Sequence, residues 1–139
     1  MAGLPSLKDI LEEYELVDRE DRYRLLIDLG RQLEPMPEAL KSDATKVRGC
    51  SASVWVYPMV RDGRLHFLAD SNAAITKGIV ALILTAVQDK SAEEVSRTDL
   101  GEALAPFELR KHLSSNRTQG VPSMIALIKE TAGRYAAAA

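Results

Sequence analysis

The chain has 139 residues and a net charge of −2, with 46% hydrophobic and 27% charged residues. This length fits a single domain over residues 1–139 with one hydrophobic core. The slightly acidic balance argues against a nucleic-acid-binding protein, which more often carries a basic face. The longest apolar run, residues 79–84, is too short to span a bilayer, so no membrane segment is expected.

The compartment is predicted from the N-terminus and from the cysteine content. The first residues show no basic stretch followed by a long apolar one, so no export signal is expected. The chain has one cysteine, which cannot form an internal disulfide and suits a reducing compartment. A cytoplasmic protein is therefore expected.

Two helices are predicted in the N-terminal quarter of the chain. Ser6 is a candidate N-cap for a helix over residues 7–17, where apolar residues recur at helical spacing. Asp18 is the candidate N-cap of a second amphipathic helix. Pro35 and Pro37 end that helix, because proline lacks the backbone N–H that a continuing helix needs.

A β-hairpin is predicted in the middle of the chain. Residues 52–60 are rich in β-branched and aromatic side chains, which favours a strand. Asp62-Gly63 then indicates a tight turn, because both residues tolerate positive φ. Residues 64–69 form the return strand. Its side chains are expected to alternate between two faces: Leu65, Phe67 and Ala69 on one, and Arg64, His66 and Leu68 on the other.

Helical patterns fill most of the remaining sequence. Residues 70–72 supply capping side chains for a long helix to about Gln88, which is apolar nearly all round and is expected at the centre of the domain. The other expected elements are a helical turn at 38–41, a short helix capped by Ser91, a helix at 106–113, a polar loop at 114–119, and a last helix that starts near Pro122 and frays over 136–139. The sum is an α+β domain in which a small antiparallel sheet packs against several helices.

Cys50 lies where a loop meets the first predicted strand. A single cysteine is usually a small, buried apolar residue. Here, however, Gly49 frees the backbone and Ser51 offers a hydrogen bond. Lys46 and Arg48 would favour the thiolate, which is the nucleophilic form. The residues alone leave two interpretations open, a packed side chain and a reactive thiol.

Neither histidine has a pattern that indicates catalysis. His66 falls in the return strand and His112 in a charged helix, and both are expected on the surface. A cysteine-protease-like site needs a base beside the thiol and a third group to orient that base. Zinc and iron–sulfur sites need about four Cys or His ligands, so no metal site is predicted.

Two other polar residues have ordinary explanations in the sequence. Asp70 is most simply a cap or turn residue at the end of the hairpin. Arg117 lies in a polar loop just before the last helix, where an arginine is ordinarily solvated. Neither residue would be singled out without further information.

Four segments, in the right order, resemble the SufE family. Val47-Arg-Gly-Cys-Ser-Ala-Ser-Val-Trp55 resembles the cysteine motif of SufE, the sulfur acceptor of the Suf iron–sulfur assembly system. Residues 23–30 are similar to its second helix, residues 70–78 to the segment before its buried helix, and residues 113–120 to its C-terminal motif. The match covers about residues 7–130, and the paralogue CsdE shares these motifs.

This resemblance implies a fold shared with the IscU/NifU-type scaffolds and a set of site residues. Cys50 would be the persulfide acceptor at a loop tip, supported by Gly49 and Ser51. Asp70 would help to hold the cysteine loop, and Arg117 would contact a partner. With one cysteine, the chain should carry sulfur rather than iron.

The resemblance also implies partners. The sulfur donor would be a pyridoxal-phosphate-dependent cysteine desulfurase of the SufS type, and the sulfur recipient would be the Suf scaffold complex. The chain itself would need no cofactor, because pyridoxal phosphate belongs to the desulfurase.

Three alternatives stay open from the sequence. The chain resembles CsdE as well, and could accept sulfur from a different desulfurase for a different pathway. It could be a cysteine-dependent hydrolase or redox enzyme that uses His66 or His112. It could also be a passive interaction protein that activates its partner by binding, with Cys50 merely packed.

Overall fold

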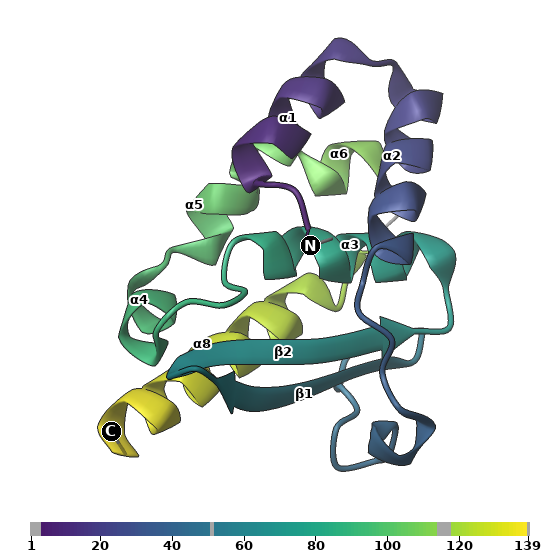
Figure 1. Ribbon diagram of the computed structural model, residues 1–139. Helices are drawn as coiled ribbons and strands as arrows, with labels where there is room; N and C mark the ends of the chain where they lie inside the picture. Colours follow the sequence, from purple (N-terminus) through teal and green to yellow (C-terminus); the bar gives the residue numbers. More distant parts are fainter. Residues whose placement is uncertain (1–3, 51, 114–117, 139) are drawn as a thin grey trace.

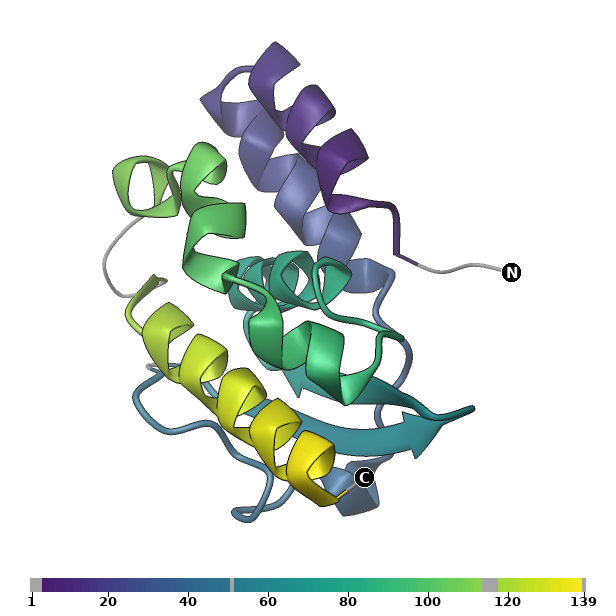
Figure 2. The same ribbon diagram turned by 90° about the vertical axis from the view of Figure 1, so that its left-hand side faces the viewer.

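The computed structural model describes residues 4–50, 52–113 and 118–138. These residues form an α+β fold, as predicted, in which an antiparallel hairpin lies against helices from both halves of the chain (Figure 1). The last helix runs alongside the hairpin in both ribbon views (Figure 2). Across the described ranges, no helix is both long enough and apolar enough to cross a bilayer.

The N-terminal helices begin where their capping residues predict. In α1 (Leu7–Leu16), the backbone N–H of Asp9 donates to Ser6 Oγ at 3.2 Å. In α2 (Arg19–Arg31), the N–H of Asp21 donates to Asp18 Oδ1 at 3.0 Å. Each bond satisfies a backbone donor that the helix leaves unpaired. The second helix ends before the two prolines, which confirms the predicted break.

Helix α3 (Ala74–Thr85) is the centre of the core, and all of its residues from Gly78 to Leu84 are buried. The prediction of a buried central helix is therefore confirmed. The predicted cap is wrong, because Ala73 occupies the N-cap position and no side chain caps the helix there. The helix also stops at Thr85, and turns follow it up to Asp89.

Helices α2 and α3 cross closely because glycines face each other at the crossing. A Cβ atom added to Gly78 would lie 2.1 Å from the carbonyl oxygen of Leu26. A Cβ atom on Gly30 would lie 2.9 Å from the backbone nitrogen of Gly78. Neither position can hold a larger residue unless the helices separate, which would open the packed core.

Within the described residues, the sheet consists of two antiparallel strands, β1 (Val54–Arg61) and β2 (Arg64–Ser71). Their register runs from Val54 opposite Ser71 to Arg61 opposite Arg64. The turn residues Asp62 and Gly63 have φ values of 51° and 75°, which confirms the predicted tight turn.

The side chains of β2 alternate between two faces as predicted, but both faces are covered. The expected surface position of His66 is wrong, because His66 and its neighbour on the same face, Leu68, are each only 6% exposed. The segment of residues 34–46, here called the strap, crosses this face after α2 (Figure 1). It then pairs with the free edge of β1, where the N–H of Val56 donates to the carbonyl of Thr45 at 2.9 Å. A 3₁₀ turn, η1 (Glu38–Leu40), lies within the strap.

The C-terminal helices differ in part from the prediction. Ser91 caps α4 (Ala92–Arg97) as expected, but α5 (Leu100–Leu104), capped by Asp99, was missed. The predicted helix at 106–113 is wrong, because Glu108 adopts a left-handed φ of 48°. The chain there divides into η2 (Ala105–Phe107) and α6 (Leu109–His112). The last helix, α8 (Val121–Ala138), includes the alanines at 136–138 that were expected to fray.

Candidate functional site

Cys50 lies in a short loop, residues 48–53, whose two ends are fixed to the hairpin. At its base, the N–H of Val47 donates to the carbonyl of Val54 at 2.8 Å, and Lys46 forms a β-bridge with Trp55. On the other limb, the N–H of Ser53 donates to Asn72 Oδ1 at 3.1 Å. Beyond these bonds, only the tip of the cysteine loop lies outside the hydrogen-bonded strands of the hairpin.

The tip turns at Gly49, which has a φ of +85°. L-amino acids with a side chain rarely adopt this left-handed conformation, so the prediction that Gly49 frees the backbone is confirmed. A Cβ atom at this position would also lie 2.9 Å from Ser123 Oγ in the first turn of α8. The tip of the cysteine loop is thus folded down against α8.

The Cys50 thiol is half-buried at the edge of the hydrophobic core. Burial raises the pKa of this thiol, and no charge among the described residues offsets that effect. The expectation that Lys46 and Arg48 favour the thiolate is therefore wrong, because both residues are exposed while the thiol points inward. In this conformation the thiol is held largely in its protonated, less nucleophilic form at neutral pH.

Asp70 joins three segments at the end of the hairpin that carries the cysteine loop. Its carboxylate lies 2.6 Å from Lys41 Nζ in the strap and 3.2 Å from Lys77 Nζ in α3, and it accepts a bond of 2.8 Å from the N–H of Ser71. Burial raises the pKa of the Asp70 carboxyl, but the hydrogen bonds from these donors outweigh burial and leave the pKa below its usual value. Asp70 stands opposite Trp55 in the ladder, one pair from the loop base.

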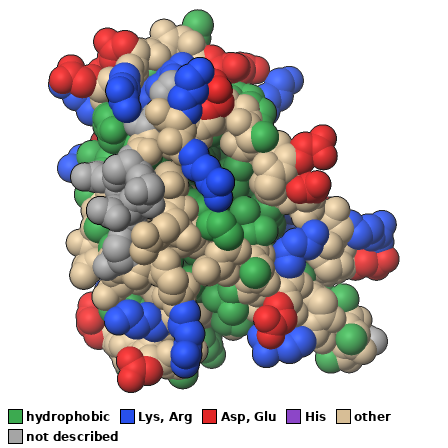
Figure 3. Space-filling model, turned by 180° about the vertical axis from the view of Figure 1, so that it is seen from behind, with side chains coloured by type: hydrophobic (Ala, Val, Ile, Leu, Met, Phe, Trp, Pro, Cys, Tyr) green, Lys and Arg blue, Asp and Glu red, His purple; other side chains and the backbone are tan. Residues whose placement is uncertain are grey.

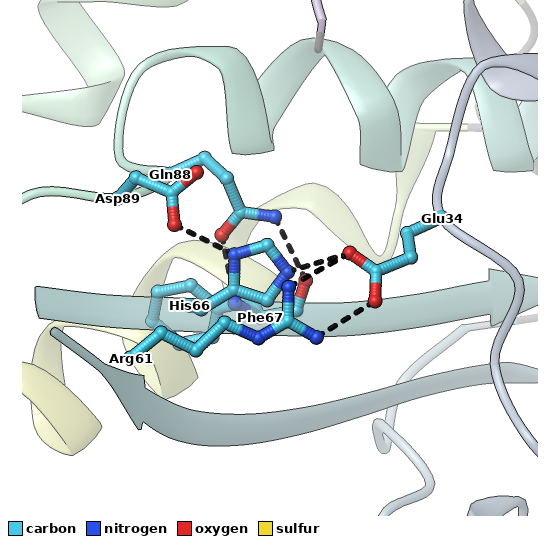
Figure 4. A network of polar contacts seen from close by, with 6 residues as sticks. All are labelled: Glu34, Arg61, His66, Phe67, Gln88 and Asp89. Carbon is cyan, nitrogen blue, oxygen red and sulfur yellow. Dashed lines mark hydrogen bonds and ion pairs between the residues drawn. The ribbon is translucent and has the colours of Figure 1, made fainter. Parts of the chain in front are cut away.

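His66 is buried in a polar cluster, so its predicted surface position is wrong (Figure 4). Its Nδ1 lies 2.7 Å from Asp89 Oδ1 and its Nε2 lies 3.0 Å from Glu34 Oε1. Arg61 holds the same Glu34 carboxylate through two hydrogen bonds, of 3.1 and 2.7 Å. We call these four residues the histidine cluster. The sequence could not reveal it, because its members come from the strap, both strands and the turn after α3.

The histidine cluster lies at the opposite end of the hairpin from Cys50. His66 pairs with Met59, whereas the cysteine loop enters β1 at Val54. Five residues of strand separate these positions, a length of about 17 Å. His66 therefore cannot act as a base for the Cys50 thiol in this conformation. Within the described residues, no group of three or more His, Cys, Asp or Glu side chains is placed to hold a metal ion.

Comparison with known proteins identifies the family. The family model SufE, an Fe-S metabolism associated domain, matches residues 8–132. The chain belongs to the SufE family. An uncharacterised SufE-like protein of Rhizobium meliloti (strain 1021) is 38% identical over 140 aligned positions, which cover 96% of this chain and 100% of the relative.

Two further comparisons extend this result. The sulfur acceptor protein CsdE of Escherichia coli (strain K12) is 38% identical over 110 positions, covering 78% of this chain and 75% of the relative. The solution structure of a hypothetical protein from Thermus thermophilus matches with a TM-score of 0.76. That match covers 94% of this chain and 96% of the other at 17% identity, so it shows a shared SufE-like fold.

The structure places only some of the predicted site residues of this SufE-family chain. Cys50 and Gly49 meet the start of α8, and Asp70 lies at the hairpin end beside the loop base. Ser51 and Arg117 lie outside the described residues. The predicted roles of all five residues, Gly49, Cys50, Ser51, Asp70 and Arg117, stay predictions.

Sequence reasoning missed the two residues of the SufE-family chain that contact the loop tip. A Cβ atom on Gly120 would lie 2.1 Å from Cys50 Sγ and 3.1 Å from Cys50 Cβ, and Ser123 faces Gly49. Gly120 was part of the C-terminal motif that resembles SufE. Nothing in the local sequence indicates that it packs against the cysteine, because that contact forms only when α8 reaches the loop.

An apolar groove begins at the same end of α8. It runs between α5, η2 and α6 on one side and the first turns of α8 on the other. Its principal apolar lining residues are Leu104, Leu109, Val121, Pro122 and Ile125. Hydrophobic side chains also gather near the middle of the face shown in Figure 3. Since Val121 directly follows Gly120, the groove and the cysteine loop meet at the start of α8.

Proposed function

We propose that this protein accepts sulfur on Cys50 as a persulfide and passes it on for iron–sulfur cluster assembly. The sulfur donor is a pyridoxal-phosphate-dependent cysteine desulfurase of the SufS type, and the recipient is the Suf scaffold complex. The observation that carries the proposal is the position of Cys50. The chain's only cysteine sits at the tip of a loop with a fixed base, in a chain that belongs to the SufE family.

The reaction is a thiol exchange whose atoms and electrons balance without a further reagent. The Cys50 thiolate attacks the outer sulfur of the persulfide on the desulfurase. A new S–S bond forms on Cys50, the donor's S–S bond breaks, and the desulfurase cysteine leaves as a thiolate. Cleavage of the C–S bond of free cysteine belongs to the desulfurase and its cofactor. This chain removes the product and so raises the turnover of its partner.

The burial of Cys50 supports a change in exposure during this reaction. The half-buried thiol has a raised pKa, so the docked loop protects it from oxidants and from unrelated electrophiles. Attack on a donor persulfide requires the sulfur to reach out of this position. We therefore propose that binding of the desulfurase releases the loop tip and exposes the thiol.

The supporting residues have separate tasks in this proposal. Gly49 provides the left-handed turn, and Ser51 stands next to the reacting sulfur in the chain. Asp70 ties the strap to α3 and so holds the loop base. Arg117 contacts the partner, because a guanidinium can make several directed hydrogen bonds at an interface.

A CsdE-type role is the second candidate, and the similarity to the E. coli protein supports it. In that case the chemistry at Cys50 is the same, but the donor desulfurase and the sulfur pathway differ. The position of His66 argues against a hydrolase that uses this histidine, because its ring nitrogens face Asp89 and Glu34 at the other end of the hairpin. A hydrolase that uses His112 is not tested, because the side chain of His112 lies outside the described part of the structure.

The proposal is tested by mass spectrometry of the intact chain after incubation with free cysteine and a desulfurase. The wild type should gain sulfur that dithiothreitol removes, and Cys50→Ser should gain none. Parallel reactions with SufS-type and CsdE-partner desulfurases show which donor is faster. A wild-type chain that stays unmodified while both desulfurases turn over would contradict the proposal. Stimulation that survives in Cys50→Ala would favour the passive interaction protein.

A further inference from the structure

We propose that Gly120 is a positioning residue that seats the resting Cys50 thiol and sets how readily the thiol leaves its docked position. We call the docked position of the Cys50 thiol against Gly120 the seat, and it is a property of the isolated chain. Its importance for sulfur transfer rests on the function proposed above.

The contacts at Gly120 are made by Cys50. The three heavy atoms nearest to a Cβ added at Gly120 would be Cys50 Sγ at 2.1 Å, Cys50 Cβ at 3.1 Å and Cys50 Cα at 3.4 Å. Gly120 itself is buried. Position 120 therefore has no room for a side chain while the thiol is docked.

The backbone does not explain the glycine at this position. Among the described glycines, positive φ values occur at Gly49 and Gly63 and not at Gly120. Alanine could therefore adopt the backbone conformation of residue 120 without left-handed strain. The requirement for glycine is steric, and it is imposed by the cysteine.

A second contact shows that Gly49, as well as Cys50, rests at the start of α8. A Cβ atom on Gly49 would lie 2.9 Å from Ser123 Oγ. Ser123 lies in the first turn of α8, three residues after Gly120. The base of the loop is fixed by Val47, Val54 and Asn72. Movement away from the seat is therefore confined to the tip, with Gly49 as the residue best able to absorb the change in backbone angles.

This geometry predicts how a methyl group at position 120 acts. The overlap with Sγ cannot be relieved at the alanine, so Cys50 must give way, by rotation of its side chain or by movement of the loop tip away from α8. Rotation alone leaves Cys50 Cβ 3.1 Å and Cys50 Cα 3.4 Å from the added methyl group, so movement of the tip relieves the crowding more completely. Overpacking of this kind favours the undocked population by a factor of about ten. The thiol is then exposed, and its pKa falls toward its ordinary value because burial is what raises it.

The test is the rate at which iodoacetamide alkylates Cys50 in the isolated, full-length protein at a fixed pH near 8. Gly120→Ala should be alkylated about tenfold faster than the wild type. The matched control is Gly133→Ala, since Gly133 lies exposed in α8, the helix that Gly120 directly precedes, and a Cβ there would meet nothing within 4 Å. Equal rates in the wild type, the control and Gly120→Ala would overturn the proposal.

Thermal unfolding separates seating from general damage. If Gly120→Ala lowers the melting temperature, the loss should be smaller when Cys50→Ala is combined with it, because Sγ is the closest obstacle. An equal loss in both backgrounds would mean that the methyl group disturbs α8 rather than the thiol, and would also overturn the proposal.

A final arm measures the use of the seat in sulfur transfer. With a desulfurase present, Gly120→Ala should need a lower concentration for half-maximal stimulation, since more of the chain is already undocked. If the wild type accepts no sulfur but Gly120→Ala is still alkylated faster, the proposed function fails and the seat stands. If the wild type accepts sulfur and the alkylation rates are equal, the seat fails and the function stands.

Discussion

The turn end of the β1–β2 hairpin and the tip of the cysteine loop are held by different kinds of contact. At the turn end, the buried His66 ring binds Glu34 and Asp89, and Arg61 closes the cluster (Figure 4). At the other end, Asp70 binds Lys41 and Lys77 beside the base of the cysteine loop. The loop tip is held differently, because Cys50 is half-buried against the bare backbone of Gly120, just before α8. Directed, charged hydrogen bonds fix the turn end, whereas close packing of the thiol holds the loop tip.

This difference shows how one small hairpin can serve two purposes. A buried ring whose two nitrogens are both bonded to partners resists local opening. A loop tip that rests by packing can leave at a modest cost, because the thiol gives up contacts rather than a strong, directed hydrogen bond. Substitutions at the turn end should therefore change stability, and substitutions at the loop tip should change reactivity.

The largest expected effect is at the thiol itself. Cys50→Ser should abolish the gain of sulfur completely, since no second cysteine exists in the chain. Serine is close to cysteine in size, so the melting temperature should change little. Intact mass and a thermal melt measure both quantities, and sulfur retained on Cys50→Ser would place the acceptor elsewhere.

The next effect concerns the predicted partner contact at Arg117. Arg117→Ala should raise the concentration needed for half-maximal desulfurase stimulation about thirtyfold, which corresponds to about 2 kcal/mol of binding. Its melting temperature should stay nearly constant, because truncation of a solvated arginine costs less than about 0.5 kcal/mol. Arg31→Ala is the control, with a side chain 75% exposed and an ion pair within its own helix. A titration of Arg117→Ala that overlays the wild type would reject the family-based role.

At the turn end, the expected effect is on folding alone. His66→Ala removes the group that bridges Glu34 and Asp89, and should lower the free energy of unfolding by about 1–3 kcal/mol. Below the unfolding transition, the variant should still accept sulfur at the wild-type rate. Urea denaturation and the mass assay test the two halves of this prediction. Loss of sulfur acceptance in the folded variant would mean that the two ends are coupled.

The smallest effect is a change in the pH dependence of stability at Asp70. Folding lowers the pKa of this carboxyl. The ionised Asp70 therefore stabilises the fold fully above the unfolded pKa of about 4, and this stabilisation is lost as the pH falls through the lower folded pKa. Asp70→Asn should be less stable at pH 7 by about 1 kcal/mol. The gap should close as the pH is lowered, and two parallel curves of stability against pH would contradict this explanation.

Much of the fold could be predicted because its signals are local. Ser6 and Asp18 mark helix starts through their own side chains, and Asp62-Gly63 marks the turn through its tolerance of positive φ. The burial of His66 could not be predicted, since it depends on a strap that arrives from a different part of the chain. The left-handed Glu108 that divides the predicted helix at 106–113 has no clear signal either.

In the candidate site, too, local signals could be predicted from the sequence and contacts between distant segments could not. The motif around Cys50 and the left-handed Gly49 could be recognised from neighbouring residues. The effect expected of Lys46 and Arg48 on the thiol could not be judged from sequence, because these residues are near Cys50 in the chain while burial raises the pKa of the thiol. Gly120 gains its meaning only from the distance to Cys50 in the folded chain.

The most direct test of the central claim is peptide mass analysis of Cys50 during desulfurase turnover. Trypsin cuts after Arg48 and Arg61, so Cys50 is recovered in the single peptide of residues 49–61. After alkylation, this peptide should carry one additional sulfur in samples taken during turnover, and dithiothreitol should remove it. A peptide that shows only the alkylated thiol while the desulfurase is active would contradict the account.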